Sequence, residues 1–597
     1  MKFQLEDLGI ATYGDCWLTF RYARHPKTGA DLALCSLSKG GFMLVDPRAQ
    51  NAIQVLPGRL FDTGWGIGQA PDGSIYQAFY DRHSWLVRWN WEGTTAARVA
   101  ELPFTTCFSL DIAPDGRVYM PDYHENVMFC YDPLSGKVSD FGSFSQFGDH
   151  IQMVSCGRDG LVYVSSITYS RGSFAVALRP QTGEKFLVDA PAGQDPRDWH
   201  ASEVRKDAAG HVLAPLRRWG REVWYELVDG KPVEIDQKQV RLAGGGLPLA
   251  FEDGGYVSQI KDKEFTHVQA DGKQVKFTIE REDSPLRIFS LETGAARVWG
   301  GTFIPLTLFS YDPAGGRFTG YGNPTRTNGE IYNSVFSKGK LFMASYTQAT
   351  LTRYAPEKPW RSDESIQANP AHLGLMKEEG LPLQRPHGKA LDTKGNVYFA
   401  AHGDYGCEDS GICRIDPDTE DVTRWIYPDT NFGALIYLSE ADRLLVSENR
   451  KSEPDTIRFT FICPRTGKVL DSRIMIRDKG DVTSWLHEGG DWVYGMHAYR
   501  ATLFAYSLKE GRIVAELREL GYGDNCYNML IFGPDGKIWG LASQCVYAVT
   551  RDLKHKEVVT EYVDNAGMNA YRFGMVYGPD GNIYFPNGTH LMRIRIE

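Results

Sequence analysis

The sequence predicts an all-β protein of two tandem β-propellers, built from about thirteen four-stranded blades. The main observation is a short phrase, usually containing Asp-Gly, that recurs along the chain with apolar-alternating stretches on either side. It reads APDGSIY at 70–76, APDGRVY at 113–119, GRDGLVY at 157–163, TKGNVY at 393–398, GPDGKIW at 533–539 and GPDGNIY at 578–584. Asp-Gly and Asn-Gly predict two-residue hairpin turns, because both central residues of such a turn need positive φ.

A second turn follows, roughly a dozen residues after the first. It reads DPLSG at 132–136, DPAGG at 312–316 and DPDTE at 416–420, with the variants RPQTG at 179–183 and CPRTG at 463–467. Proline presets φ in such a turn, and glycine closes it. One unit is therefore strand, Asp-Gly turn, strand, loop, strand, Asp-Pro turn and strand, an antiparallel meander of about 40 residues.

Taken in order, seven units begin near Trp17, Trp65, Phe108, His150, His200, Leu247 and Leu286, and six more begin near Tyr332, His387, Gly433, Trp485, Asn528 and Tyr571. A single ring of thirteen exceeds the usual four to eight blades. We therefore expect one propeller of about seven blades over residues 1–322 and another of six to seven over 323–597. The last unit offers only three strands, so the N-terminal FQLEDLG can supply the fourth and remove a free edge. Residues 357–386 break the period and predict an inserted loop or short helix.

Composition narrows the classes of partner. The 597-residue chain has a formal charge of −10 and no Lys/Arg-dense stripe, which argues against nucleic acid. It has no run long enough to span a membrane and no apolar leader at its start. We expect a cytoplasmic protein, or an extracellular one if a leader has been removed, acting on a small-molecule or oligosaccharide substrate. The ten cysteines are scattered and predict reduced, mostly buried thiols.

The candidate site follows from the hairpin turns, which define cross-strand neighbours. Centring the turn of one blade between Lys394 and Gly395 places His387 opposite His402. The same construction pairs His200 with Arg217, and His150 with Thr168 or Tyr169. These pairs fall at the end of each blade that faces a channel mouth, where function usually resides. Further candidates at the ends of second strands are Arg450, His497, Tyr499 and Arg500.

Histidine is the side chain that exchanges a proton near neutral pH without a strong pKa shift. A lone histidine at a strand end is more often a hydrogen-bonding rim residue, but an opposed His–His pair with Tyr and Arg nearby favours a site. No Walker loop, GxSxG elbow or HExxH motif is present. The register itself slips by one residue wherever a β-bulge intervenes.

The phrase RPHGKALDTKGNVYFAAH at 385–402, followed by GICRIDPDTEDVTRW at 411–425, resembles the repeat of streptogramin lyases and related lactonase-type propellers. Paired histidines with Tyr and Arg at a mouth are also similar to propeller polysaccharide lyases and rhamnose–glucuronate-cleaving enzymes. That likeness implies His387 and His402, with Tyr499 and Arg500 as the Tyr and Arg. The streptogramin lyases also suggest a metal-assisted elimination, but their acidic ligands have no residue-by-residue match here.

Three functions fit these residues. The first is β-elimination of a uronate-containing oligosaccharide, with His387 or His402 as base, Tyr499 as acid, and Arg500 or Arg450 neutralising the carboxylate. His150, Tyr169, His200 and Arg217 form a rival site on the first propeller, and His497 is a further substrate-binding candidate. The second is a non-catalytic ligand- or protein-binding propeller. The third is a metal-dependent lactonase or glycoside hydrolase. The favoured mechanism requires no cofactor, although a divalent metal is compatible with the third.

Overall fold

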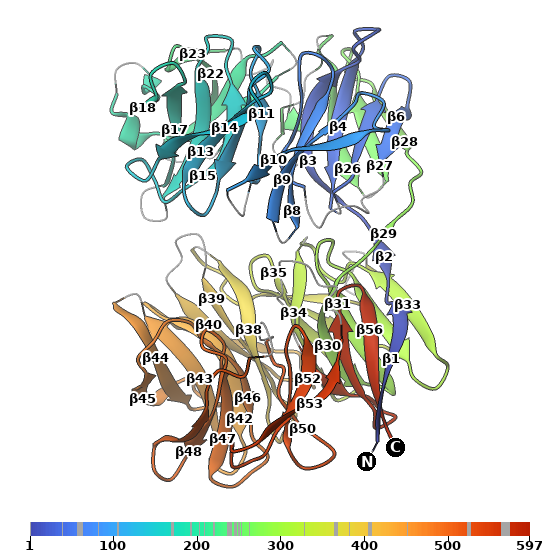
Figure 1. Cartoon of the computed structure of the whole chain (residues 1–597), viewed down its shortest axis with the longest axis vertical. Coiled ribbons are helices and arrows are strands. Elements are labelled where there is room, and N and C mark those ends of the chain that lie inside the picture. The colour runs from blue at the N-terminus through green and yellow to red at the C-terminus, as the bar shows by residue number, and fades with distance from the viewer. Residues whose placement is uncertain are drawn as a thin grey trace. The chain divides into compact units, whose positions relative to one another are not determined.

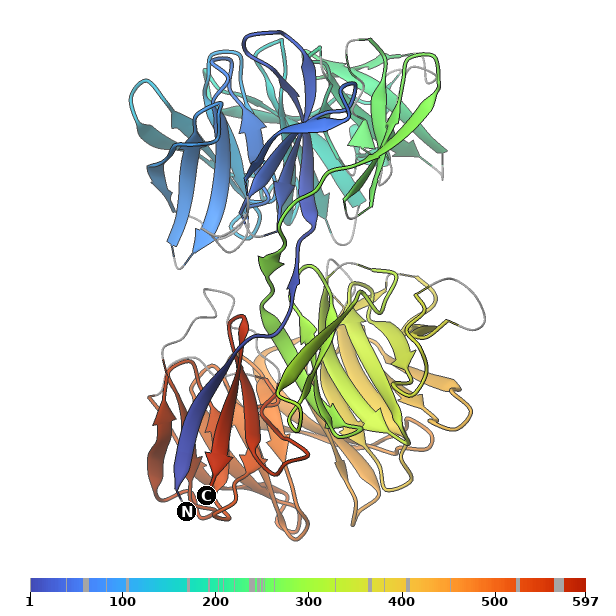
Figure 2. The same cartoon turned by 90° about the vertical axis from the view of Figure 1, so that its right-hand side faces the viewer.

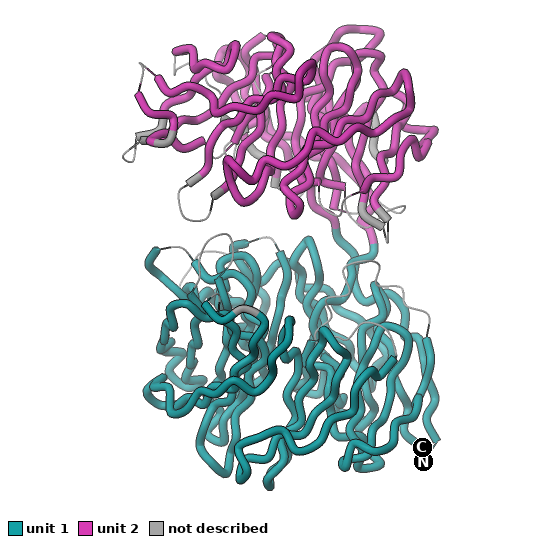
Figure 3. The backbone as a smooth tube through the Cα atoms, turned by 60° about the vertical axis from the view of Figure 1, so that its left-hand side comes forward, with its two compact units in different colours: residues 1–14, 285–597 teal, residues 15–284 magenta. Residues whose placement is uncertain are grey.

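The chain folds as two compact units, one of residues 15–284 and one of residues 1–14 and 285–597 (Figure 3). We refer to them as the six-bladed unit and the seven-bladed unit. The computed structural model describes all residues except 1, 39, 57–63, 82, 104–106, 169–171, 192–193, 202, 208, 219–220, 236–241, 244–246, 249–250, 252, 262, 328, 363–367, 381, 404–408, 451, 522–526 and 563–573. Among the described residues, the chain is a succession of antiparallel sheets, almost all four-stranded, which confirms tandem propellers.

The strands of the six-bladed unit form consecutive meanders (Figure 1). The first blade contains β3 (Trp17–Arg24), β4 (Asp31–Leu37), β5 (Phe42–Asp46) and β6 (Asn51–Leu56). The second contains β7 (Ile67–Gln69), β8 (Ile75–Asp81), β9 (His83–Trp89) and β10 (Ala96–Leu102). The third contains β11 (Asp111–Ile112), β12 (Val118–Asp122), β13 (Val127–Asp132) and β14 (Lys137–Ser143). The fourth contains β15 (His150–Cys156), β16 (Val162–Thr168), β17 (Gly172–Arg179) and β18 (Glu184–Leu187).

The last two blades of this unit are less regular. The 3-10 turn η2 (Pro196–Asp198) precedes the fifth blade, β19 (His200–Ala201), β20 (Arg205–Lys206), β21 (Val212–Arg218), β22 (Arg221–Val228) and β23 (Lys231–Glu234). Its innermost strand is split, since β19 and β20 both pair with β21. A short pair, β24 (Leu242–Ala243) and β25 (Leu247–Pro248), precedes the sixth blade, β26 (Tyr256–Lys261), β27 (Glu264–Val268) and β28 (Gln274–Thr278).

The seven-bladed unit is built in the same way. Its first blade is β30 (Ile288–Gly294), β31 (Arg297–Thr302), β32 (Leu308–Asp312) and β33 (Arg317–Gly322). The second is β34 (Glu330–Ser337), β35 (Lys340–Tyr346), β36 (Thr350–Tyr354) and β37 (Ala371–Leu375). The third is β38 (Leu383–Leu391), β39 (Val397–Gly403), β40 (Ser410–Ile415) and β41 (Val422–Tyr427). The fourth is β42 (Asn431–Leu438), β43 (Arg443–Arg450), β44 (Glu453–Ile462) and β45 (Val469–Ile476).

Three further blades complete this ring. The fifth is β46 (Val482–Leu486), β47 (Trp492–His497), β48 (Thr502–Ser507) and β49 (Arg512–Leu517). The sixth is β50 (Ile531–Phe532), β51 (Ile538–Leu541), β52 (Cys545–Val549) and β53 (Lys556–Glu561). The seventh is β54 (Val576–Tyr577), β55 (Ile583–Asn587), β56 (His590–Ile596) and the N-terminal strand β1 (Phe3–Ile10). Figure 2 shows β1 beside the last strands of the chain. Phe3 pairs with Ile596 and Asp7 with Met592, so the N-terminal segment supplies the missing strand.

The chain divides at 14/15 and 284/285, and not between 322 and 323 as expected from the sequence. The blade β30–β33 belongs to the seven-bladed unit because its apolar residues pack against the last blade. Leu291, Phe309 and Tyr311 form one core with Tyr584 and Leu591. The sequence shows where each blade begins, but not which neighbouring blade its core contacts. The arrangement is six and seven blades.

The repeated turns differ in detail from expectation. In the first copy, the Gly73 amide donates to the Ala70 carbonyl at 2.8 Å, and only the glycine has positive φ, at 87°. This is a three-residue loop, a type I turn followed by a left-handed glycine, and not a two-residue turn. The Asp-Pro turns close as expected: the Gly136 amide donates to the Asp132 carbonyl at 2.8 Å.

The segment 357–386 has no helix among its described residues. It contains the outer strand β37 and a bridge between Arg361 and Asn369. The eight described cysteines are free thiols and mostly buried, and Cys407 and Cys526 lie outside the described residues. No described helix is long and apolar enough to cross a membrane.

Candidate functional site

The innermost strands of the seven-bladed unit carry β-bulges, which determine what faces the site. Register shifts fall between Ile288 and Ser290, between Ile331 and Asn333, and between Arg385 and Gly388. A bulge leaves its extra residues outside the ladder and turns their side chains. The residues released in three consecutive blades are Phe289, Tyr332 and the pair Pro386-His387.

These released residues form a continuous aromatic row. The rings of Phe289 and Tyr332 lie 4.9 Å apart between centroids, and those of Tyr332 and His387 lie 5.4 Å apart. Tyr527, just before the sixth blade, lies 4.7 Å from His387. Such separations are typical of favourable aromatic contacts. The row therefore links side chains from the first, second, third and sixth blades.

His387 and His402 lie side by side, but the expected register is wrong. The backbone partner of His402 is Arg385, because two register shifts interrupt β38. The bulge nevertheless brings the imidazoles together, with centroids 4.9 Å apart and planes at 61°. Both side chains are buried, at 5% and 9% exposure.

The two imidazoles have different environments. His402 Nδ1 lies 2.7 Å from the Gly403 carbonyl oxygen, which requires a proton on Nδ1 and makes Nε2 the basic nitrogen of the neutral ring. Burial holds the pKa of His387 well below its ordinary value, and repulsion from His402, when that ring is protonated, and from Arg385 lowers it further. His387 is therefore a neutral imidazole at physiological pH.

Two arginines contact aromatic rings that pack against Phe289 and Tyr332 of this row. The Arg385 guanidinium lies 5.8 Å from the centroid of Tyr346, and that of Arg287 lies 5.3 Å from Phe303, both suitable for cation–π contact. Glu330, the backbone partner of Tyr346, is buried. Burial raises the pKa of its carboxyl to about 8, although Arg385 opposes this shift. At neutral pH the Glu330 carboxyl is therefore largely protonated.

The bulge of β38 is held by side-chain amides. Asn333 Nδ2 donates to the carbonyl oxygens of Pro386 at 2.7 Å and His387 at 2.9 Å. Asn528 Nδ2 donates to Asn333 Oδ1 at 2.9 Å. A Cβ on Gly388 would lie 2.9 Å from the Gly433 carbonyl oxygen, so only glycine fits after His387. This explains the Pro-His-Gly sequence in physical terms: it allows the bulge to approach the next blade closely.

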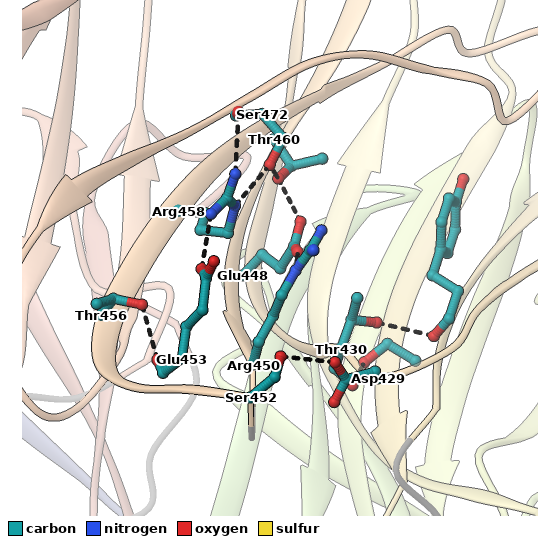
Figure 4. A network of polar contacts seen from close by, with 12 residues as sticks. Asp429, Thr430, Glu448, Arg450, Ser452, Glu453, Thr456, Arg458, Thr460 and Ser472 are labelled. Carbon is teal, nitrogen blue, oxygen red and sulfur yellow. Dashed lines mark hydrogen bonds and ion pairs between the residues drawn. The ribbon is translucent and has the colours of Figure 1, made fainter.

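Arg450 belongs to a separate polar network on the fourth blade (Figure 4). Its Nε donates to Glu448 Oε1 at 2.5 Å, and Glu448 also accepts a hydrogen bond from Thr460. Thr460 and Ser472 hydroxyls lie 2.8 Å apart, which extends the network to the outer strand β45. A buried carboxylate thus already neutralises Arg450, so a structural role explains its position.

The other candidates on second strands also have local partners. Arg500 forms an ion pair with Asp478, and its side chain is 63% exposed. Tyr499 is 63% exposed in the turn after β47. His497 is buried, with Nε2 2.7 Å from the Lys479 carbonyl oxygen. No ring or polar contact in the described part of the chain joins these three residues to His387.

The rival residues lie in the six-bladed unit. His200 is the backbone partner of Arg217, as predicted. His150 is the partner of Ile167, so the expected pairing with Thr168 or Tyr169 is wrong; a register shift within β15 accounts for the difference. His150 stacks on Tyr123 at 4.3 Å, and its Nδ1 lies 2.6 Å from the Tyr123 carbonyl oxygen. Tyr169 lies outside the described residues.

Four residues of this site were not among those predicted from the sequence. Arg385 stands in the phrase that resembles the lyase repeat, but its spacing alone assigns it no role. Glu330, Tyr332 and Tyr527 carry a weaker signal, because a bulge cannot be read from alternation. Within the described residues, no group of three or more His, Cys, Asp or Glu is arranged to hold a metal ion.

No protein-family model matches the chain, and no curated protein matches it. Solved structures similar to it include two of the extracellular domain of BT4673 from B. thetaiotaomicron. One is 12% identical, covers 94% of this chain and 74% of that one, and has a TM-score of 0.35. The other is 13% identical, covers 99% and 82%, and has a TM-score of 0.36. A streptogramin B lyase is 13% identical, covers 52% of this chain and 93% of that one, and has a TM-score of 0.40. By its own blade topology, the chain is a tandem β-propeller protein.

Proposed function

We propose that the seven-bladed unit is a carbon–oxygen lyase that cleaves a uronate-containing oligosaccharide by β-elimination. The observation that carries the proposal is the contact between His387 and His402 beside Arg385, within an aromatic row. Aromatic rings stack on sugar faces, and a guanidinium binds a carboxylate through paired hydrogen bonds. The site therefore suits a ring-shaped anionic ligand.

The roles follow from the chemistry of each group. Arg385 neutralises the uronate carboxylate, which acidifies the proton on the adjacent ring carbon. His402 Nε2 takes that proton, and the C–H electron pair forms a carbon–carbon double bond as the bond to the leaving oxygen breaks. Tyr332 or Tyr527, both against His387, donates a proton to the leaving oxygen. Neutral His387 positions these rings. The step is redox-neutral.

This assignment moves two roles from the residues first expected. Arg450 and Arg500 lie in local ion pairs with Glu448 and Asp478, whereas Arg385 is close enough to His387 to lower its pKa. Tyr499 lies in an exposed turn, whereas Tyr332 and Tyr527 contact His387. The proposal keeps His387 and His402 at its centre.

The test is a panel of uronate-containing oligosaccharides, followed by the ultraviolet absorbance of an unsaturated product. His402→Gln should reduce turnover by about 10²- to 10⁴-fold, the usual contribution of a positioned base. Tyr499→Phe and His200→Ala should retain activity. If His200→Ala alone is inactive, the site lies on the six-bladed unit. Calorimetric binding of the sugars without turnover would instead indicate a non-catalytic binding propeller.

A further inference from the structure

A second cluster of charged residues lines the channel of the six-bladed unit, away from the residues assigned to the lyase. A cavity of about 60 Å³ is bordered by innermost strands of five blades. Its charged lining residues are Arg21 on β3, Asp111 on β11, Arg205 and Lys206 on β20, and Asp207. This volume is sufficient for a few water molecules or one small ion.

Both carboxylates of this cavity are engaged by neighbours. Lys206 Nζ lies 2.7 Å from Asp111 Oδ1, and Asp111 Oδ2 accepts a hydrogen bond from the Cys156 amide at 2.6 Å. Asp207 accepts hydrogen bonds from the Ala209 amide and from the His211 amide and ring. Lys206 and these two carboxylates are therefore satisfied within the protein.

Arg21 differs from the other cations. Its Nη1 donates to the Phe20 carbonyl at 3.0 Å and its Nη2 to Ser109 Oγ at 2.9 Å, both neutral acceptors. Among the described residues, no carboxylate forms an ion pair with it. Burial and the charge of Arg205 lower the pKa of Arg21 to about 10, although the attraction of Asp111 opposes this shift. Arg205 itself donates from Nε to Glu203 at 2.7 Å. Two guanidinium groups thus face one cavity, and of these two only Arg205 forms an ion pair with a carboxylate among the described residues.

We propose that this channel binds a small oxyanion, a phosphate or a carboxylate, between Arg21 and Arg205. The planar guanidinium group presents donors in a fork that matches such oxygens, and Arg21 uses two of its five N–H groups in the described contacts. Lys206 also lines the cavity, but its charge is already paired with Asp111. The proposal is independent of the lyase assignment because it concerns the other unit.

The experiment is isothermal titration of the full chain with inorganic phosphate, sulfate and acetate, each against sodium chloride of equal ionic strength. We expect one saturable site, and a Kd weakened about 10- to 100-fold by Arg21→Gln, the loss typical of a charge-assisted hydrogen bond. Arg117→Gln is the matched control, since Arg117 is exposed and pairs with Asp115 in the same unit. The stronger of phosphate and acetate identifies the class of oxyanion.

Arg205→Gln provides a second test. Arg21→Lys provides a third, because it retains the charge, and its affinity for the oxyanion should lie between those of the wild type and Arg21→Gln. Circular dichroism verifies that each variant is folded. Absence of saturable binding by all three oxyanions in the wild type would overturn the proposal. It would also be overturned if folded Arg21→Lys and Arg205→Gln both bind as tightly as the wild type.

Discussion

Phe3 lies edge-on to Trp539, with ring centroids 4.8 Å apart and planes at 84°. One residue belongs to the first strand of the chain and the other to β51, in the sixth blade. The same N-terminal strand carries Glu6, which lies 2.7 Å from Arg593 Nε and 3.1 Å from Arg595 Nε. The first residues therefore stabilise the end of the chain.

Deleting residues 2–10 should destabilise the seven-bladed unit and leave the six-bladed unit unchanged. The deletion removes the strand that pairs with β56, so the backbone groups along that side of β56 become a free sheet edge. Phe3→Ala alone should cost about 1–3 kcal/mol, because the ring is only partly buried. Calorimetry that resolves two transitions is the measurement. Tyr13→Ala, at a residue 55% exposed, should change neither; equal effects of the two substitutions would contradict this account.

The six-bladed unit should depend on one buried ion pair. Arg281 Nη1 lies 3.9 Å from Asp15 Oδ2, both side chains are buried, and Arg281 Nη2 donates to the Asp15 carbonyl at 3.0 Å. The pair joins the two ends of this unit. Arg281→Met should reduce its free energy of unfolding by about 3–5 kcal/mol, because the Asp15 charge stays buried. The control is Lys276→Met, which breaks an exposed pair with Glu264 and should cost less than about 1 kcal/mol.

Glu330 should make the seven-bladed unit less stable at alkaline pH. Its folded pKa is about 8 and its ordinary value 4.5, so between these limits the folded protein holds a proton that the unfolded chain lacks. The stabilisation that this proton contributes is therefore fully present below about pH 4.5 and is lost as the pH rises towards 8. Glu330→Gln removes this loss and should stabilise the unit at pH 8.5, relative to pH 5, by on the order of 3 kcal/mol.

Urea unfolding at several pH values measures how the free energy of unfolding depends on pH in the wild type and in Glu330→Gln. The lowered pKa of His387 acts in the opposite direction: its stabilisation is present above about 6.5 and is lost as pH falls below that value. The comparison is therefore best made in a His387→Gln background as well. If the free energy of unfolding depends on pH in the same way in Glu330→Gln as in the wild type, the Glu330 carboxyl has an ordinary pKa in the folded protein.

Arg385→Gln should lower kcat/KM of the proposed elimination by about 10²- to 10³-fold, since the developing charge on the substrate carboxylate loses its cation. Arg385→Lys should restore part of the loss in kcat but not the paired hydrogen bonds. Steady-state kinetics with the same ultraviolet readout is the measurement. Arg424→Gln, which removes an arginine paired with Glu378 on the outer strand of the same blade, should leave kcat/KM unchanged.

The sequence was sufficient for the blades because turns and alternation are local signals. It placed the Asp-Pro turns, the starts of the meanders and the pairing of His200 with Arg217. It failed where a local rule is broken by packing. The bulges at Tyr332 and His387 depend on contacts with neighbouring blades, such as the approach of Gly388 to Gly433. Glu330 and Tyr527 join the site through the ring's geometry, which no pairwise spacing encodes.

The chain passes between its two units at 14/15 and 284/285, and the strands at these crossings, β2 (Tyr13–Gly14) and β29 (Ser284–Pro285), form one two-stranded sheet. The six-bladed unit, residues 15–284, is therefore inserted in sequence within the seven-bladed unit. Domains whose ends are adjacent are readily inserted or excised. Joining Gly14 directly to Pro285 should yield a seven-bladed protein that folds by itself. Residues 15–284 can be excised as one segment, because both of its junctions lie in the same two-stranded sheet.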